Sequence, residues 1–151
     1  MTVYRITKRK YADDLSGKGA ERYGGRWNNV GIPVLYTSEH RSLCLLEMLI
    51  HTPIEEIARN LMLVEIIIPD EYPAFHITTK DLSRTWKTFP YDRFTKDVGD
   101  ELLRAKNHPV IRVPSALVDE EFNYLLNPKH ELFNGISVKK ANALELDSRF
   151  F

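Results

Sequence analysis

The chain has 151 residues, a length that suits one hydrophobic core, and we expect residues 1–151 to form a single domain. Lys plus Arg and Asp plus Glu both number 21, so the formal net charge is zero. Proteins that mainly grip a nucleic-acid backbone are usually basic, so we expect no direct nucleic-acid partner. The single cysteine, Cys44, excludes a disulfide framework and lies in an apolar run, where we expect a buried small hydrophobe.

Export and membrane signals are missing from the sequence. The N-terminal run MTVYRITKRK lacks the apolar segment of a signal peptide, and no apolar run reaches the length of a membrane span. We therefore expect a cytoplasmic protein with no membrane partner.

Extended and helical patterns alternate in the first third of the chain. Residues 3–8 alternate well enough for an edge strand, with every second side chain on one face. Residues 11–31 are rich in Gly and polar groups and are typical of a long loop, and residues 32–37 form a short strand. Ser38 is expected to cap a helix that runs to about His51.

A second helix start follows at once. The run Thr52-Pro53-Ile54-Glu55 predicts a capping box with Pro at the first helical position, and a short helix that ends near residue 60. Residues 61–68 (LMLVEIII) predict a strand that Pro69 closes, and residues 75–78 predict another short strand.

The second half of the chain predicts one more helix and several strands. Apolar side chains recur at helical spacing between residues 92 and 106, with Gly99 lowering the helix propensity. Strands are expected at 110–113 and 122–126, and the tail alternates from Ile136 onward. Strands outnumber helices and do not alternate strictly with them. We therefore expect an α+β domain with a mixed or mostly antiparallel sheet and flanking helices.

One carboxylate interrupts the most apolar stretch of the sequence. Residues 43–50 read LCLLEMLI, so Glu47 shares a helix with apolar side chains on most sides. A buried and unpaired carboxylate costs several kcal/mol or takes up a proton. The residues leave two readings open: a structural ion pair with an arginine such as Arg26 or Arg112, or a cleft in which Glu47 meets a ligand.

Two other segments carry candidate polar groups. Gly24 and Gly25 precede Arg26, and their N–H groups are expected to form an anion-binding nest beside a guanidinium that binds phosphate or carboxylate in bidentate fashion. Ser115 follows a strand end and a proline, where a turn serine that bonds its own backbone is the simpler reading. No GxGxxG, GxxxxGK[ST] or GxSxG pattern is present, which excludes a Rossmann fingerprint, a P-loop and a hydrolase elbow.

The histidines predict no metal site. They do not form an HExxH motif or a His/Cys cluster, and their spacing is not that of metal ligands. The five are His40, His51, His76, His108 and His130.

These segments together resemble the RES-domain family, the toxin half of RES–Xre toxin–antitoxin modules. The matching motifs are "GGRWN..G.PVLYTSE..SL.LLE.L.H", which carries an arginine and a glutamate, and "VPSA......NYLLNP.H", which carries a serine. The opening "YRIT" and the run "YADDLSGKGA" fit as well. Arg, Glu and Ser are the residue types that give the family its name.

The resemblance implies a fold similar to ADP-ribosyltransferase toxins and an enzyme that destroys NAD. It implies that the nicotinamide–ribose bond is cleaved by hydrolysis or phosphorolysis, with NAD as substrate, inorganic phosphate as a possible co-substrate and no metal. It further implies an Xre-type helix-turn-helix antitoxin that plugs the active site, in a hetero-oligomer built on a toxin homodimer.

Carried over residue by residue, the resemblance implies an active-site set and further contacts to NAD. Glu47 would stabilise the ribosyl cation, Arg26 would clamp pyrophosphate or phosphate, Tyr36 would stack on nicotinamide, and Ser115 would bind a ribose or phosphate oxygen. Further contacts to NAD are expected from Arg5, Asn28 and Asn123.

Two other functions stay open at this point. One is a mono-ADP-ribosyltransferase that modifies a protein, although many such enzymes carry Glu or Gln two residues before the catalytic Glu, where this chain has Leu45. The other is a non-catalytic nucleic-acid-binding module with Tyr23, Trp27 and Tyr36 as stacking platforms, which the zero net charge disfavours.

Overall fold

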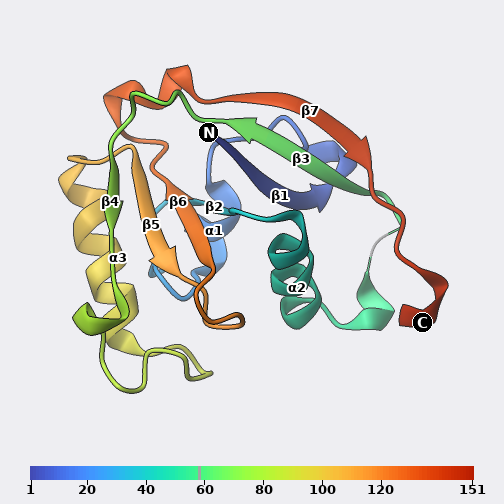
Figure 1. Cartoon of the computed structure of the whole chain (residues 1–151), viewed down its shortest axis with the longest axis horizontal. Coiled ribbons are helices and arrows are strands. Elements are labelled where there is room, and N and C mark those ends of the chain that lie inside the picture. Colours follow the sequence, from blue (N-terminus) through green and yellow to red (C-terminus); the bar gives the residue numbers. More distant parts are fainter. Residues whose placement is uncertain (58) are drawn as a thin grey trace.

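A seven-stranded mixed sheet organises the chain (Figure 1). The computed structural model describes residues 1–57 and 59–151. The strand order is β4-β5-β6-β2-β1-β3-β7, and every pair is antiparallel except β4 with β5. The strands are β1 Thr2–Lys8, β2 Leu35–Ser38, β3 Leu61–Ile67, β4 Ala74–His76, β5 Val110–Pro114, β6 Phe122–Leu126 and β7 Ser137–Ala143. The predicted α+β class is confirmed.

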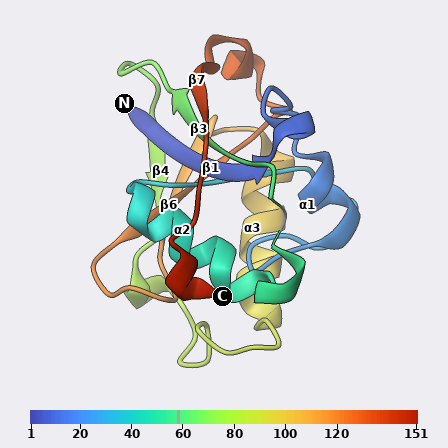
Figure 2. The same ribbon diagram turned by 90° about the vertical axis from the view of Figure 1, so that its right-hand side faces the viewer.

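Three α-helices flank this sheet. Figure 1 shows α3 beside β5 and α2 beside β1, in different halves of the molecule, and Figure 2 shows the same ribbon turned by 90°. The α-helices are α1 Lys18–Tyr23, α2 Arg41–His51 and α3 Arg93–Ala105. Single 3-10 turns lie at η1 Arg9–Tyr11, η2 Ile54–Glu56, η3 Thr79–Asp81, η4 Glu131–Gly135 and η5 Ser148–Phe150.

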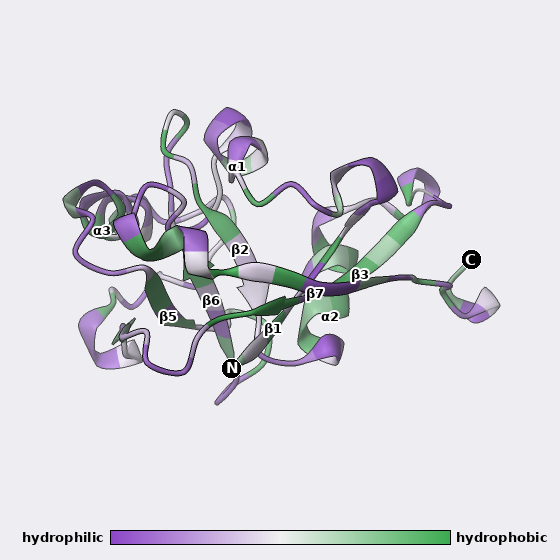
Figure 3. Ribbon diagram, turned by 90° about the horizontal axis from the view of Figure 1, so that it is seen from above, coloured by the Kyte–Doolittle hydropathy of each residue, from purple (hydrophilic) through white to green (hydrophobic). Residues whose placement is uncertain are grey.

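The sheet is divided into two halves at the boundary between β1 and β2. Among the described residues these strands share a single register pair, Tyr4 with Ser38, whereas β1 pairs with β3 along its whole length. Helix α2 packs against both β1 and β2 and so bridges this seam. The apolar residues, green in Figure 3, form two core clusters that do not follow this division: one joins Val64 of β3 to Val110 and Leu126 of β5 and β6, and the other contains Ile111 and Leu125 of the same two strands.

Several predicted elements in the first third of the chain are wrong in place or extent. β1 is a central strand rather than an edge strand, and its Val3 is fully buried. The expected loop 11–31 contains helix α1. β2 begins at Leu35, because the residues before it form a turn in which the Ile32 N–H donates to the Asn29 carbonyl.

The helix boundaries differ from the predicted caps. His40 rather than Ser38 occupies the N-cap position of α2, because Ser38 still belongs to β2. Thr52 ends α2 instead of opening a capping box, and only the turn η2 follows; residue 58 of the predicted helix lies outside the described residues. A capping box does exist at Thr78, at the start of η3. α3 is confirmed, with the Asp92 side chain accepting from the Phe94 N–H.

Gly99 seats α3 against the loop before β2. A Cβ at this position would lie 1.8 Å from the Trp27 carbonyl oxygen, so the helix backbone touches the Trp27 backbone directly. The glycine that lowers helix propensity is therefore required by a close approach. The contact holds α3 against Trp27, the residue that follows Arg26 in the chain.

We expect Gly99→Ala to destabilise the protein by about 1–3 kcal/mol, because the overlap with Trp27 outweighs the better helix propensity of alanine. Urea unfolding followed by circular dichroism measures the change. The matched control is Gly19→Ala in α1, where a Cβ meets no atom within 4 Å and stability should stay equal or rise slightly. Equal stabilisation by both substitutions would contradict the close contact.

Candidate active site

A cavity of about 610 Å³ lies at the seam between the two half-sheets. Its walls come from β1 and β2, from both α1 and α2, and from the segment that connects α1 to Trp27. Five predicted site residues line it: Arg5, Arg26, Tyr36, Glu47 and Asn123. Residues more than a hundred positions apart in sequence therefore meet around one space.

Glu47 stands on the cavity wall rather than in a closed helix face. Its side chain is 24% exposed, and its neighbours Leu46 and Ile50 on α2 are exposed as well. The Asn123 amide Nδ2 donates to its Oε1 at 2.7 Å. In the described part of the chain Oε2 has no hydrogen bond, and the one basic side chain within 4 Å of it is His51, whose Nε2 lies at 3.7 Å. One carboxylate oxygen is thus held by the protein and the other faces a space large enough for a ligand.

The ion pair between Glu47 and an arginine, one of the two readings that the sequence left open, is not formed among the described residues. Arg112 lies over the ring of Phe122, with its guanidinium carbon 3.2 Å from the ring centroid. Arg26 shares the cavity with Glu47 but donates its Nη1 to the carbonyls of Trp86, at 2.6 Å, and Thr88, at 3.1 Å. The reading of Glu47 as a cleft residue is therefore the one that agrees with the structure.

Arg26 is fixed before any ligand arrives. Besides the two carbonyl contacts, its guanidinium carbon lies 5.0 Å from the ring centroid of Tyr91. Burial lowers the pKa of Arg26, while the nearby Tyr91 and Glu47 raise it, and an arginine remains charged under such opposing shifts. Its Nε and Nη2 make no hydrogen bond to the described residues, which leaves donors for an anion.

Ser115 touches Glu47 from behind the cavity wall. It is 2% exposed, and its Oγ accepts from the N–H groups of Leu117 and Val118, which is the turn predicted as the simpler reading. The same hydroxyl donates to Glu47 Oε1 at 3.5 Å. The contact of Ser115 is therefore with the carboxylate, and its own hydroxyl does not line the cavity.

Asn123 has a fixed orientation. Its Oδ1 accepts from the Ser38 hydroxyl at 2.7 Å, so its amide NH₂ is the group presented to Glu47. Ser38 also forms the register pair with Tyr4 at the seam. The sheet boundary and the carboxylate are thus connected through two consecutive hydrogen bonds.

Tyr36 and Asn28 form a polar pair under the loop. The Tyr36 hydroxyl donates to Asn28 Oδ1 at 2.7 Å and accepts from the Trp27 N–H at 3.0 Å, and burial raises the pKa of Tyr36. Asn28 is fully buried, and its Nδ2 donates to the carbonyls of Ala20, at 2.8 Å, and Ile32, at 2.9 Å. Asn28 therefore does not line the cavity, contrary to the predicted NAD contact, because the loop backbone uses its polar atoms.

The predicted anion-binding nest is also wrong. The Gly24 N–H donates to the Ala20 carbonyl at 2.8 Å, and the Gly25 N–H donates to the Asn28 carbonyl at 3.0 Å. A Cβ on Gly25 would lie 2.7 Å from the Tyr36 hydroxyl oxygen. These glycines serve the close packing that places Arg26, and their N–H groups are already used.

Arg5 lines the cavity from β1. Its Nη1 donates to the Asp14 carbonyl at 2.7 Å, and burial lowers its pKa, against the raising influence of Asp14 and Cys44. Burial raises the pKa of the Cys44 thiol to about 12, so the neutral, apolar role expected for this cysteine agrees with the structure.

His51 and Tyr91 line the cavity near Glu47, and the sequence did not predict either as a site residue. His51 lies four residues after Glu47 on α2, with Nε2 3.7 Å from Glu47 Oε2, and its Nδ1 lies 3.3 Å from the Tyr91 hydroxyl. The i, i+4 spacing on one helix face was a usable signal for His51. Tyr91 had no such signal, because it approaches from a segment 40 residues further along the chain.

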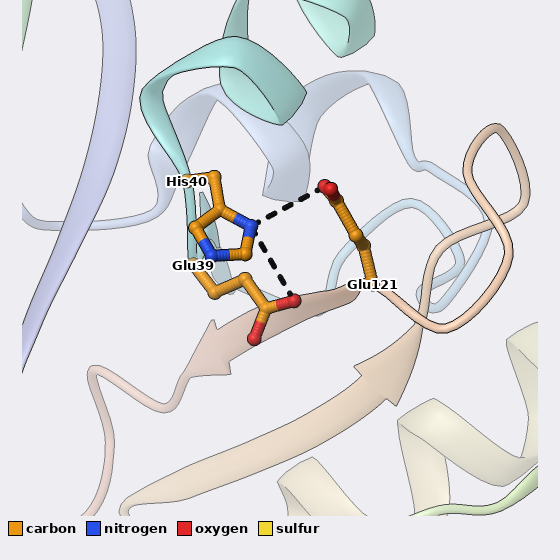
Figure 4. A group of neighbouring side chains, drawn as sticks. All are labelled: Glu39, His40 and Glu121. Atoms are coloured by element: carbon orange, nitrogen blue, oxygen red, sulfur yellow. Dashed lines mark ion pairs between the residues drawn. The ribbon is translucent and has the colours of Figure 1, made fainter.

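A second cluster of titratable side chains lies before α2 (Figure 4). His40 Nδ1 is 3.6 Å from Glu39 Oε1 and 3.4 Å from Glu121 Oε2, and the three groups are of kinds that bind metals. Glu39 Oε1 also accepts from the Phe122 N–H at 2.8 Å, and all three side chains reach solvent. The cluster joins the start of α2 to the loop before β6, and the absence of a metal stays a prediction.

The described helices include none with both the length and the apolar character needed to cross a bilayer.

Comparisons with known proteins show two relatives that match most of the chain and one that matches a shorter part of it. A relative from Sphingobium sp., named Prs ADP-ribosylating toxin, is 37% identical over 140 residues, which cover 91% of this chain and 87% of the relative. One from Yersinia enterocolitica, named Toxin Res, is 37% identical over 134 residues, 88% of each protein. NAD(+) phosphorylase MbcT from Mycobacterium tuberculosis is 42% identical over 48 residues, only 31% of this chain and 25% of that protein.

The fold has a solved counterpart. A chain in the crystal structure of the M. tuberculosis MbcT-MbcA toxin-antitoxin complex matches with a TM-score of 0.75 and 20% identity, over 95% of this chain and 83% of that one. The family model of the RES domain matches residues 2–147. Because that model spans nearly the whole sequence and the relatives are similar over most of their length, the chain belongs to the RES domain family.

Proposed function

We propose that this protein is the toxin of a type II toxin–antitoxin module and depletes NAD by cleaving the nicotinamide–ribose bond. The observation that carries the proposal is Glu47, with one oxygen held by Asn123 and the other unbonded on the wall of a 610 Å³ cavity that also contains Arg26. The names of the relatives, an ADP-ribosylating toxin and an NAD(+) phosphorylase, support a substrate of this class.

The reaction needs one anion and no acid for the leaving group. The bond between the anomeric carbon and the nicotinamide nitrogen breaks, and its electron pair returns to the nitrogen, so the charged pyridinium leaves as a neutral base. Positive charge develops on the ribose as in other glycoside cleavages. An acceptor oxygen then bonds to the anomeric carbon. Water gives ADP-ribose and releases one proton, whereas phosphate gives ADP-ribose phosphorylated at that carbon.

Each side chain has a role in this scheme. The Oε2 of Glu47 accepts from a ribose hydroxyl and stabilises the developing cation, while Asn123 and Ser115 hold Oε1 and so fix the carboxylate. The free donors of Arg26 bind the pyrophosphate or an incoming phosphate. Tyr36 and Arg5 complete the cavity wall.

The acceptor separates two versions of the activity. Phosphate as acceptor is supported by the printed name of the mycobacterial relative, and a protein acceptor is supported by that of the Sphingobium relative, which is similar over far more of the chain. We favour depletion of NAD, with transfer of ADP-ribose to a protein as the second candidate.

Control of the activity is proposed to come from a partner. The fold match to a chain in a toxin-antitoxin complex supports an antitoxin that covers the cavity. We propose an Xre-type helix-turn-helix protein for this role and a toxin homodimer within the hetero-oligomer.

Incubation of the purified protein with NAD should release nicotinamide, and phosphate should accelerate the release and appear in the ADP-ribose product. Chromatography of the products, with and without phosphate, measures both effects. Radiolabelled NAD incubated with a cell extract tests for a labelled protein in the same experiment. Intact NAD after both incubations, with the protein folded, would exclude NAD cleavage, and label on a protein would establish the second candidate.

Glu47→Gln should lower kcat by about 100-fold or more, because it removes the charge that stabilises the ribosyl cation. The fold should survive, since a glutamine oxygen still accepts from Asn123. The matched control is Glu101→Gln at an exposed position of α3, with unchanged activity. A Glu47→Gln protein that unfolds more easily yet keeps its activity would show that Glu47 is structural.

Arg26→Lys should raise KM for NAD by about 10- to 100-fold, because an ammonium cannot satisfy both carbonyls and clamp an anion as well. Steady-state kinetics against Arg93→Lys, an exposed arginine on α3, isolate the effect from the change of residue type. An unchanged KM would remove Arg26 from substrate binding.

A further inference from the structure

We propose that Tyr91 is a positioning residue for this active site and that its aromatic ring and its hydroxyl have separate roles. The ring holds the Arg26 guanidinium, and the hydroxyl sets the proton on His51 that faces Glu47. The inference rests on the proposed function for its kinetic consequences, but the contacts that carry it are independent of the substrate.

The ring completes a holder for Arg26. Trp86 and Thr88 each accept from Nη1 of Arg26, and Tyr91, three residues later, places its ring 5.0 Å from the guanidinium carbon. Two carbonyls and one aromatic face from a single short segment therefore fix the plane of the guanidinium. Its remaining donors keep one direction, whether or not an anion is present.

The hydroxyl decides which nitrogen of His51 carries a proton. His51 Nε2 faces Glu47 Oε2 at 3.7 Å, and an ionised carboxylate can only accept. The Tyr91 hydroxyl lies 3.3 Å from Nδ1 and can donate to it, which leaves the proton of a neutral imidazole on Nε2. A phenylalanine at this position would keep the ring over Arg26 but would free Nδ1 to take the proton.

The segment that carries Tyr91 is anchored at both ends. Asp92 accepts from Ser83 and Thr85 while it caps α3, so the loop is closed on itself next to Tyr91. Lys87 forms an ion pair with Asp119 in the turn that follows Ser115. Tyr91 therefore contacts both α2 and the Arg26 loop, and its segment reaches the turn after Ser115 through Lys87.

Kinetics of Tyr91→Phe and Tyr91→Leu separate the two parts. Tyr91→Phe should lower kcat by about 3- to 10-fold with KM nearly unchanged, because one neutral hydrogen bond is lost. Tyr91→Leu should in addition raise KM by about 3- to 30-fold, because Arg26 loses its aromatic face. In a His51→Ala background, Tyr91→Phe should have no further effect on kcat.

A second measurement does not need activity. Nitrogen-15 NMR of the imidazoles at about pH 9, with the His51 signals assigned by His51→Ala, should show the proton on Nε2 in the wild type and a shift toward Nδ1 in Tyr91→Phe. Tyr11→Phe, which removes a half-exposed hydroxyl outside the cavity, is the matched control and should change neither the NMR signals nor the kinetics.

The outcomes distinguish the two hypotheses. If NAD is not cleaved but the His51 signals are as expected, the proposed function is excluded and the role of the Tyr91 hydroxyl still holds. A proton on Nδ1 in the wild type, identical His51 signals in Tyr91→Phe, or additive effects of Tyr91→Phe and His51→Ala on kcat would overturn the role of the hydroxyl. Equal KM values for the Phe and Leu variants would overturn the role of the ring.

Discussion

The single register pair between Tyr4 and Ser38 is the constraint on which the rest of the structure depends. A sheet paired along the full length of β1 and β2 would close the space that now forms the cavity. Helix α2 crosses the seam and brings Glu47 to the opening, while Ser38 orients the Asn123 amide toward that carboxylate. The geometry between the half-sheets thus acts on Glu47 both through α2 and through the hydrogen bonds of Ser38 and Asn123.

The division of labour between the two oxygens of Glu47 explains how a carboxylate can be both fixed and available. Oε1 takes the hydrogen bonds that hold the side chain in place. Oε2 accepts no hydrogen bond from the described residues and lies 3.7 Å from His51 Nε2, so its lone pairs are available to a ligand. Because Glu47 is partly exposed, α2 does not bear the several kcal/mol that full burial of an unpaired charge would cost.

The sequence predicted the participants better than their contacts. The family resemblance named Arg26, Glu47 and Ser115 together; the structure brings Arg26 and Glu47 to one cavity and Ser115 into contact with Glu47, while their catalytic roles stay predictions. The roles of Gly24 and Asn28 could not be predicted, since both depend on which loop carbonyls need partners after folding. Tyr91 was missed because its contacts join segments far apart in sequence, and periodicity reports only on neighbours along one element.

The central position of β1 was missed for a related reason. Half-buried side chains on a strand beside a cavity show the same alternation as those on a strand at the edge of a sheet. The caps at Ser38 and Thr52 failed because strand pairing claimed the first and the end of α2 the second. Local signals were overruled in each case by partners that only the three-dimensional arrangement supplies.

Arg26 shows what such an arrangement gains for recognition. A free arginine side chain carries about 2 kcal/mol of rotamer entropy, which is lost when a ligand orders it. Here the carbonyls of Trp86 and Thr88 and the ring of Tyr91 have already removed that freedom during folding. Folding of the domain therefore supplies the free energy that orders Arg26. An anion that makes few contacts then binds to a side chain that is already ordered.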